Sequence, residues 1–137
     1  MIHRFTHTFL TTTSALLLTL IGIQFISADV VINEIHYDED DKTIRSEFIE
    51  LFNPSNDPVD LSGYYFSSGI NFEFPAGTIL AAGDYLVIAE NPATILSRFE
   101  YSGALGPFAN ESSLKNSGER ITLRNPARTT LDDVAHQ

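Results

Sequence analysis

Residues 74–89 read FPAGTILAAGDYLVIA, and this stretch says most about the fold. Pro75-Ala76-Gly77 ends one extended segment, and Ala81-Ala82-Gly83-Asp84 is a second turn signal. Between and after these turns, residues 78–80 and 85–89 are extended, and the run YLVIA is the most strand-like in the chain. The stretch predicts short strands joined by tight turns, with residues 85–89 as a central strand.

The same pattern continues on both sides of this stretch. Strands are predicted over residues 30–37, 47–52, 64–67, 71–74 and 119–124, with a last strand that begins near Leu131 and is cut short at Gln137. Such spacing is typical of an antiparallel β-sandwich. Asn91 before Pro92 predicts a short helix over residues 92–99, the only helix expected. In the run 47–52, apolar side chains alternate onto both faces, so this strand is predicted to be packed on two sides.

Composition narrows the class of protein. The chain has 137 residues, of which 43% are hydrophobic, enough for one domain with one core. Its formal net charge is −10, and no segment is basic enough to neutralise successive phosphates, so nucleic acid is excluded as a partner. The same charge disfavours an anionic membrane surface. Cysteine is absent, so neither disulfides nor a cysteine-ligated metal can hold the fold.

The first 28 residues have the pattern of an export signal. Arg4 precedes an apolar stretch, densest over residues 15–26, that ends at Ser27-Ala28. Cleavage after Ala28 is predicted to leave residues 29–137 as a secreted or cell-envelope domain without stable membrane insertion. The alternative is an uncleaved N-terminal anchor over residues 9–28, a length that can span a bilayer. An exported chain without cysteine suits a bacterial envelope or medium.

Five segments carry a resemblance to a known family. They are residues 31–35 (VINEI), 47–53 (EFIELFN), 60–64 (DLSGY), 74–89 and 116–124 (NSGERITLR). In their order and spacing they resemble the lamin tail domain family, found on nuclear lamins and on many exported bacterial proteins. The resemblance covers about residues 30–135. It implies an all-β, immunoglobulin-like antiparallel sandwich with no catalytic role.

The chain departs from the family pattern at two places. Tyr64 stands where many relatives carry tryptophan, which keeps an aromatic ring in the expected core. Family members usually continue past the segment Asp132-Asp133-Val134 through one full last strand. This chain therefore resembles a C-terminally truncated product or the front fragment of a larger surface protein.

Candidate catalytic pairs are few. Glu34 and His36 are two residues apart on a strand and share a face, so they can be read as an acid and base pair or as a solvated strand face; the second reading is favoured. Glu47 and Glu50 are three apart, so a regular strand points them to opposite faces and excludes a carboxylate pair. We predict no catalytic residues and no enzymatic activity.

The acidic run Asp38-Glu39-Asp40-Asp41 is the best candidate for a calcium site in an exported protein. It does not fit an EF-hand, because Thr43 and Ile49 fall where that loop needs glycine and glutamate. A solvated hairpin tip is the favoured interpretation. Of the histidines, His3 and His7 lie in the signal segment, and His36 and His136 form no recognisable ligand pair, so no metal or cofactor is assigned.

Two classes of function remain open at this point. The first is a non-catalytic exported module that binds or scaffolds a protein, glycan or envelope component, with ligand and oligomeric state undetermined. The second is a calcium-dependent or enzymatic accessory unit that uses the run 38–41. Most of the ten Phe and five Tyr residues lie inside strand patterns and are interpreted as core side chains rather than as a carbohydrate platform, with some exposed exceptions expected. The triplet Asn110-Glu111-Ser112 fits the N-glycosylation pattern, which arises often by chance.

Overall fold

The computed structural model describes residues 29–37 and 43–137 and contains, within them, eight short strands, one α-helix and one 3₁₀ turn. In chain order the elements are β1 (Val31–His36), β2 (Phe48–Phe52), β3 (Val59–Asp60), β4 (Tyr65–Ser68), β5 (Ile79–Leu80), β6 (Tyr85–Ala89), α1 (Pro92–Phe99), the 3₁₀ turn (Ala109–Glu111), β7 (Glu119–Arg124) and β8 (Thr130–His136).

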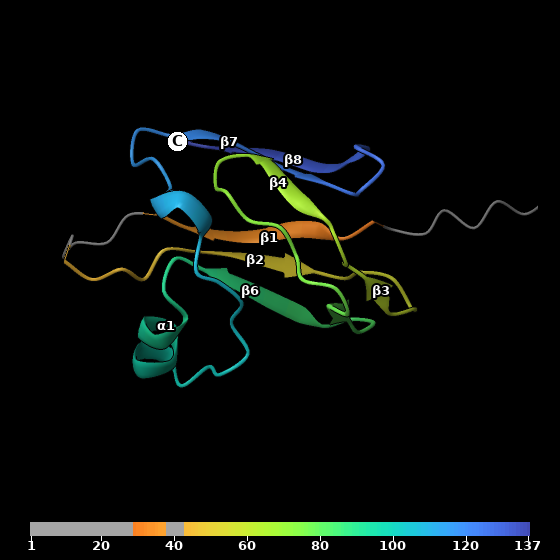
Figure 1. Cartoon of the computed structure of the whole chain (residues 1–137), viewed down its shortest axis with the longest axis horizontal. Helices are drawn as coiled ribbons and strands as arrows, with labels where there is room; N and C mark the ends of the chain where they lie inside the picture. The colour runs from red at the N-terminus through yellow and green to blue at the C-terminus, as the bar shows by residue number, and fades with distance from the viewer. Residues whose placement is uncertain (1–28, 38–42) are drawn as a thin grey trace, which may run out of the picture.

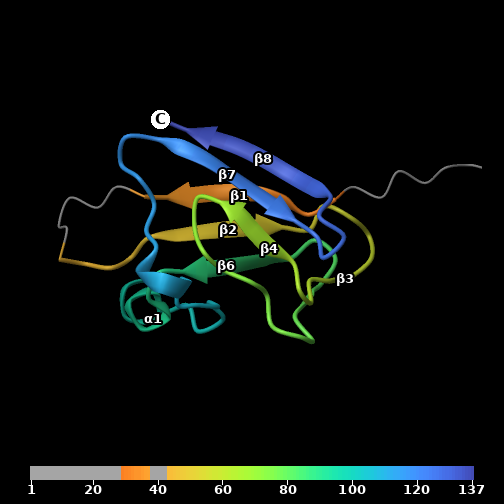
Figure 2. The same cartoon turned by 45° about the horizontal axis from the view of Figure 1, so that its top comes forward.

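The strands form two facing layers (Figure 1). One sheet has the order β1-β2-β6 and the other the order β4-β7-β8, and a two-stranded ribbon of β3 and β5 lies at one end. Every pairing between named strands is antiparallel. In the turned view, β4 and β7 cross in front of the β1-β2-β6 sheet, and α1 lies near the end of β6 (Figure 2). The fold is an immunoglobulin-like antiparallel β-sandwich with one short α-helix.

Strand β2 shows how the sequence builds the sandwich. Ile49 and Leu51 are fully buried between the layers, whereas Phe48, Glu50 and Phe52 on the opposite face are only half-buried. Packing is therefore complete on the inner face of β2 and only partial on its outer face, so the prediction of a strand packed on two sides holds in part. The alternation gives the β1-β2-β6 sheet an inner apolar face and an outer face that mixes aromatic and acidic side chains.

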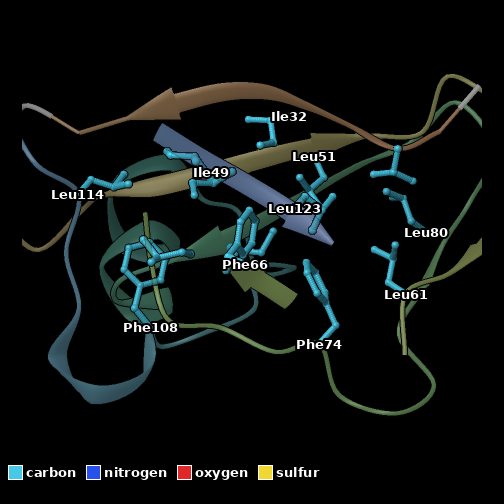
Figure 3. Packing of buried hydrophobic residues seen from close by; sticks show 14 residues of the cluster. Ile32, Ile49, Leu51, Leu61, Phe66, Phe74, Leu80, Phe108, Leu114 and Leu123 are labelled. Atoms are coloured by element: carbon cyan, nitrogen blue, oxygen red, sulfur yellow. The ribbon is translucent and has the colours of Figure 1, made fainter. Parts of the chain in front are cut away.

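The core lies between the two sheets (Figure 3). Aliphatic side chains from β2 and β7 meet at its centre, and three phenylalanines fill the space toward the loops. Each fully buried side chain of this size contributes roughly 1.5–3 kcal/mol, so in a chain without disulfides this core stabilises the fold. Its buried members are Val30, Ile32, Ile49, Leu51, Leu61, Phe66, Ile70, Phe74, Leu80, Ile88, Phe108, Leu114, Ile121 and Leu123.

Strand β6 has the predicted bounds but not the predicted place. It lies at the edge of its sheet, and β2 is the central strand. The outer face of β6 is covered by α1. There Val87 and Ala89 of β6 form a small buried cluster with Ile95 of the helix. The free edge of β6 is partly satisfied by Leu105, which exchanges two backbone hydrogen bonds of 2.8 Å with Val87 and Ala89. Both faces of β6 carry apolar residues because one packs in the core and the other packs on α1, not because β6 lies between two strands.

Residues 71–74 do not form the predicted strand. They make one isolated bridge, between Glu73 and Tyr65. The backbone of Asn71 is engaged elsewhere: its N–H donates to the Ser112 hydroxyl (2.9 Å), and its carbonyl accepts from the Ala109 N–H (2.7 Å). The start of the segment is therefore held by the 3₁₀ turn, which the sequence did not predict. The rest still bonds to the β4 segment, because the Phe72 carbonyl accepts the Phe66 N–H (3.0 Å) and the Phe74 N–H donates to the Tyr64 carbonyl (2.8 Å).

The last strand begins one residue before the predicted start. It spans the seven residues Thr130–His136 and pairs along β7 from Glu119 to Arg124. It also contacts β1. The Ile32 N–H donates to an Asp132 carboxylate oxygen (2.7 Å), and the Tyr37 hydroxyl donates to the Gln137 carbonyl (2.6 Å). That the natural protein continues beyond this strand stays a prediction.

The turn after β2 is built on one buried side chain. Asn53 is fully buried, and its Nδ2 donates to the carbonyls of Asp57 (2.8 Å), Leu80 (3.1 Å) and Ala81 (3.1 Å). Its Oδ1 accepts from the amide and the hydroxyl of Ser55. The predicted surface turn over residues 53–58 is therefore held to the β5 segment from inside.

Tyr64 keeps an aromatic ring against the core, as predicted. It is half-buried and packs on the main cluster. Burial raises the pKa of its hydroxyl, and the charges of Asp29 and Asp60 act in the same direction.

Candidate functional site

Glu34 and His36 lie on the outer face of the β1-β2-β6 sheet. Glu34 stands directly across from Glu50, and His36 stands across from Phe48. Glu34 is exposed, whereas the His36 ring stacks on Phe48 with 5.0 Å between centroids and 13° between planes. The two residues thus share a face, and the imidazole of His36 packs on an aromatic ring.

Glu47 and Glu50 are not brought together as a pair. Glu47 precedes β2, and its Oε2 accepts the Leu114 N–H at 2.7 Å. Glu50 lies within β2, and its Oε1 accepts from Nδ2 of Asn33 at 2.8 Å. Each carboxylate has its own partner, and Glu47 serves to fix the loop before β7.

No metal site is evident in the described residues. The acidic run 38–41 lies outside them, as do His3 and His7. Within residues 29–37 and 43–137, no three His, Cys, Asp or Glu side chains gather into a group that could hold a metal ion. The ring of His136, at the end of β8, lies 4.1 Å from the ring of Tyr37.

The glycosylation triplet lies in the 3₁₀ turn. Asn110 is exposed and has a left-handed backbone, with φ 54°. The Ser112 hydroxyl of the triplet already accepts the Asn71 N–H. The triplet therefore has a structural role in closing this loop.

A hollow that sequence reasoning missed lies between β2, β6 and α1. We call it the outer groove. It has a volume of about 230 Å³ and a mostly apolar lining. Three of its aromatic side chains stay open to solvent: 51% of Tyr85, 49% of Phe99 and 36% of Tyr101. Clustered exposed apolar groups mark interaction sites more often than scattered ones do. The groove is lined by Phe48, Glu50, Tyr85, Val87, Ile95, Phe99 and Tyr101.

Helix α1 forms one wall of the outer groove. Asn91 caps it by accepting hydrogen bonds from backbone N–H groups of the first turn, and Pro92 occupies the first helical position. Ile95 is buried against Val87 of β6 and fixes the helix on the sheet. Phe99, in the last turn, is left facing the groove. The capping signal of Asn91 and Pro92 thus starts the helix that carries Phe99 to the outer face of the sheet.

Aromatic contacts order the rings around the outer groove. Phe52 and Tyr85 stack across β2 and β6 with 4.7 Å between centroids. Phe48 meets the edge of Phe99 at 6.3 Å. Such pairs contribute about 0.5–1.5 kcal/mol each beyond the area they bury. The guanidinium of Arg98 lies 5.4 Å from the Phe99 centroid, so one ring of the groove already attracts a cation.

The outer groove carries negative charge. Glu50 lines it, and Glu34 stands across from Glu50 on β1. Like charges directly opposite on neighbouring strands repel. In the part of the chain that the structure describes, Glu50 receives a hydrogen bond from Asn33 and no ion pair from Lys or Arg. Among the described residues, the groove therefore has an apolar lining with one carboxylate that forms no ion pair with Lys or Arg.

A second, more polar hollow lies beside the start of α1. It has a volume of about 440 Å³. Arg45 and Glu90 at its rim form an ion pair of 2.6 Å. The hydrogen bond and charge of Glu90 raise the pKa of Arg45. Because Arg45 is largely exposed, this pair adds little stability and is best read as surface structure.

The outer groove left a weak signal in the sequence. Phe48 and Phe52 flank Glu50 on one face of a strand whose other face is wholly aliphatic. Core strands of a sandwich need only one apolar face, so two aromatic residues on the second face indicate a covered or functional surface. The interpretation of most aromatic residues as core holds for Phe66, Phe74 and Phe108, and the exposed rings at the groove are the exceptions.

The comparisons with known proteins agree with the fold. The model of the family described as Lamin Tail Domain matches residues 25–137, which is most of the chain. None of the curated proteins gives a significant match. In the described residues, no helix is long and apolar enough to cross a membrane. With the family match over the whole sandwich, the chain belongs to the Lamin Tail Domain family.

Proposed function

We propose that the protein is an exported, non-catalytic binding module that contacts its partner, a component of the cell envelope, through the outer groove. The observation that carries this proposal is the cluster of three solvent-exposed aromatic side chains on one face of an otherwise well-packed sandwich. Family membership supports a module of immunoglobulin-like fold rather than an enzyme.

The candidate acids and bases support the non-catalytic reading. His36 is stacked on Phe48, and Glu47 is used to hold the Leu114 amide. The side chains that remain available on this face are suited to contact rather than to proton transfer.

Binding is tested by cosedimentation of the protein, purified after expression of the full chain, with isolated bacterial envelopes. We expect the wild type to sediment with envelopes and the double variant Tyr85→Ala/Phe99→Ala to remain mostly in the supernatant. Ile79→Ala is the matched control, because Ile79 is 58% exposed but lies on β5 outside the groove. Equal sedimentation of all three proteins, or of none, would refute the proposal.

Export is tested separately in a secreting bacterial host. We expect the full chain to appear outside the cytoplasm with Asp29 as its first residue, because Ala28 ends the apolar signal. Intact mass and N-terminal sequencing give the answer. Recovery of an uncleaved chain in the membrane fraction would indicate an anchor, and recovery in the cytoplasm would contradict export.

A further inference from the structure

The outer groove combines two features that rarely suit the same ligand. Its lining is mostly apolar, with the rings of Phe48, Tyr85, Phe99 and Tyr101 around it. It also contains the carboxylate of Glu50, whose described contact is the hydrogen bond from Asn33. A purely apolar ligand would remove this charge from water without compensation, which costs free energy.

Other ligand classes fit the groove less well. An anion would be repelled by Glu50 and by Glu34 across the strand pair. A neutral sugar presents many hydroxyl groups, and a mostly apolar lining leaves most of them without partners. A nucleic acid is disfavoured by the net charge of −10.

A cation with an apolar surface satisfies both features. The faces of aromatic rings attract organic cations, and the attraction grows as the cation is desolvated. Within the molecule, the guanidinium of Arg98 lies 5.4 Å from the Phe99 centroid, a distance compatible with such a contact. Arg98 also donates to the Ser46 hydroxyl (2.6 Å), which holds the guanidinium at the start of β2.

We propose that the outer groove binds a small quaternary ammonium compound. Its methylated head lies against the rings of Tyr85, Phe99 and Tyr101, and Glu50 is its counter-ion. A volume of about 230 Å³ suits a ligand of this size and not a folded partner or a long peptide. This inference rests on the proposed function, because it names the ligand chemistry of the same groove.

Choline is the probe, and its neutral isostere 3,3-dimethylbutan-1-ol is the control ligand. The two have the same shape and differ in the charge of the head. We expect choline to shift the amide NMR signals of β2, β6 and α1 in the wild-type protein, with a dissociation constant about tenfold lower than that of the neutral isostere. Glu50→Gln is expected to remove most of this tenfold preference without changing the affinity for the isostere.

Glu73→Gln is the matched control variant, because Glu73 is exposed and lies outside the groove. It is expected to bind choline as the wild type does. Equal affinity for choline and the isostere, an unchanged preference in Glu50→Gln, or the absence of choline-dependent shifts in these elements would each overturn the inference. Glu50→Gln keeps the shape of the side chain, and its amide spectrum reports whether the fold is retained.

The two proposals fail in different ways. If choline does not bind but envelope binding still depends on Tyr85 and Phe99, only the proposed ligand class is refuted. The proposal of a binding module then stands. Choline binding at the groove without envelope binding would refute the proposed partner and support the ligand class.

Discussion

Asn53 holds the turn after β2 through one buried amide. Its Nδ2 reaches three backbone carbonyls, and its Oδ1 accepts twice from Ser55. Replacement by alanine removes these partners and leaves buried carbonyls unsatisfied. The sequence marks this residue only as part of a turn signal, because its burial depends on β5, which arrives some 27 residues later in the chain.

We therefore expect Asn53→Ala to lower the free energy of unfolding by about 2–3 kcal/mol. Asn56→Ala in the same turn is the control, since Asn56 is exposed and should change stability by at most about 0.5 kcal/mol. Urea unfolding followed by far-UV circular dichroism measures both. Equal effects of the two substitutions would mean that the buried amide does not hold the turn.

Asp60 makes the free energy of unfolding depend on pH in the acid range. The Ser62 hydroxyl donates to its carboxylate, as does the Ser62 N–H at 2.9 Å, and these bonds lower the pKa of Asp60. A carboxyl with a lower pKa in the folded state stabilises the fold above its unfolded pKa of about 3.9. This contribution is lost as the pH falls through the lower, folded pKa.

The stability difference between wild type and Asp60→Asn is therefore expected to be present at pH 6 and to shrink as the pH falls below about 4. Urea midpoints measured across this range test it. A difference that stays constant down to the acid limit would show that the charge of Asp60 has no part in it.

At the scale of elements, sequence patterns located β6, β7 and α1 with the bounds that the structure has. Each is five residues or longer and has either a continuous periodic pattern or an explicit cap. The two-residue strand β3 is too short to show a period, and residues 71–74 form only one bridge because Asn71 bonds to the distant 3₁₀ turn. The sequence thus predicted the elements that are long enough to show a period or that carry a cap.

The outer groove could not be predicted in the same way. Its residues come from β2, β6, α1 and the segment after it, and the groove exists only because Ile95 sets the helix on the outer face of β6. The sequence indicates that a helix follows β6 but not which face of the sheet it covers. The exposure of Tyr85 and Phe99 depends on that choice.

Helix α1 is expected to depend on its cap. Asn91→Ala removes an acceptor for two N–H groups in the first turn and should cost about 1 kcal/mol of stability. Ser97→Ala is the control on the exposed side of the same helix, with an expected change below about 0.5 kcal/mol. Thermal unfolding of the two variants tests this, and equal melting temperatures would contradict a role for the cap.

At the scale of the whole molecule, the two sheets share one core. Leu123 of β7 is fully buried and belongs to the same cluster as Ile49 and Leu51 of β2. The layers should therefore unfold together, because neither sheet can bury its inner face alone.

Leu123→Ala is expected to lower the free energy of unfolding by about 3 kcal/mol and to keep a single transition. Leu96→Ala serves as the control, since Leu96 is half-exposed on α1 and outside the core. Its effect should be below about 1 kcal/mol. Coincident far-UV and near-UV melting curves check cooperativity, and two separate transitions would show that the sheets unfold independently.

The contact between the first and last strands has a mechanical meaning. Ile32 with Asp132, and Tyr37 with Gln137, are pairs that lie 100 residues apart, so β1 and β8 run side by side in the same direction. The start of β1 and the end of β8 therefore lie at opposite ends of the sandwich (Figure 2). Tension applied at Asp29 and Gln137 runs along the two strands and loads their contacts together, in shear, instead of peeling them apart one at a time. A domain stretched in this way resists force through its unfolding rate, whatever its equilibrium stability.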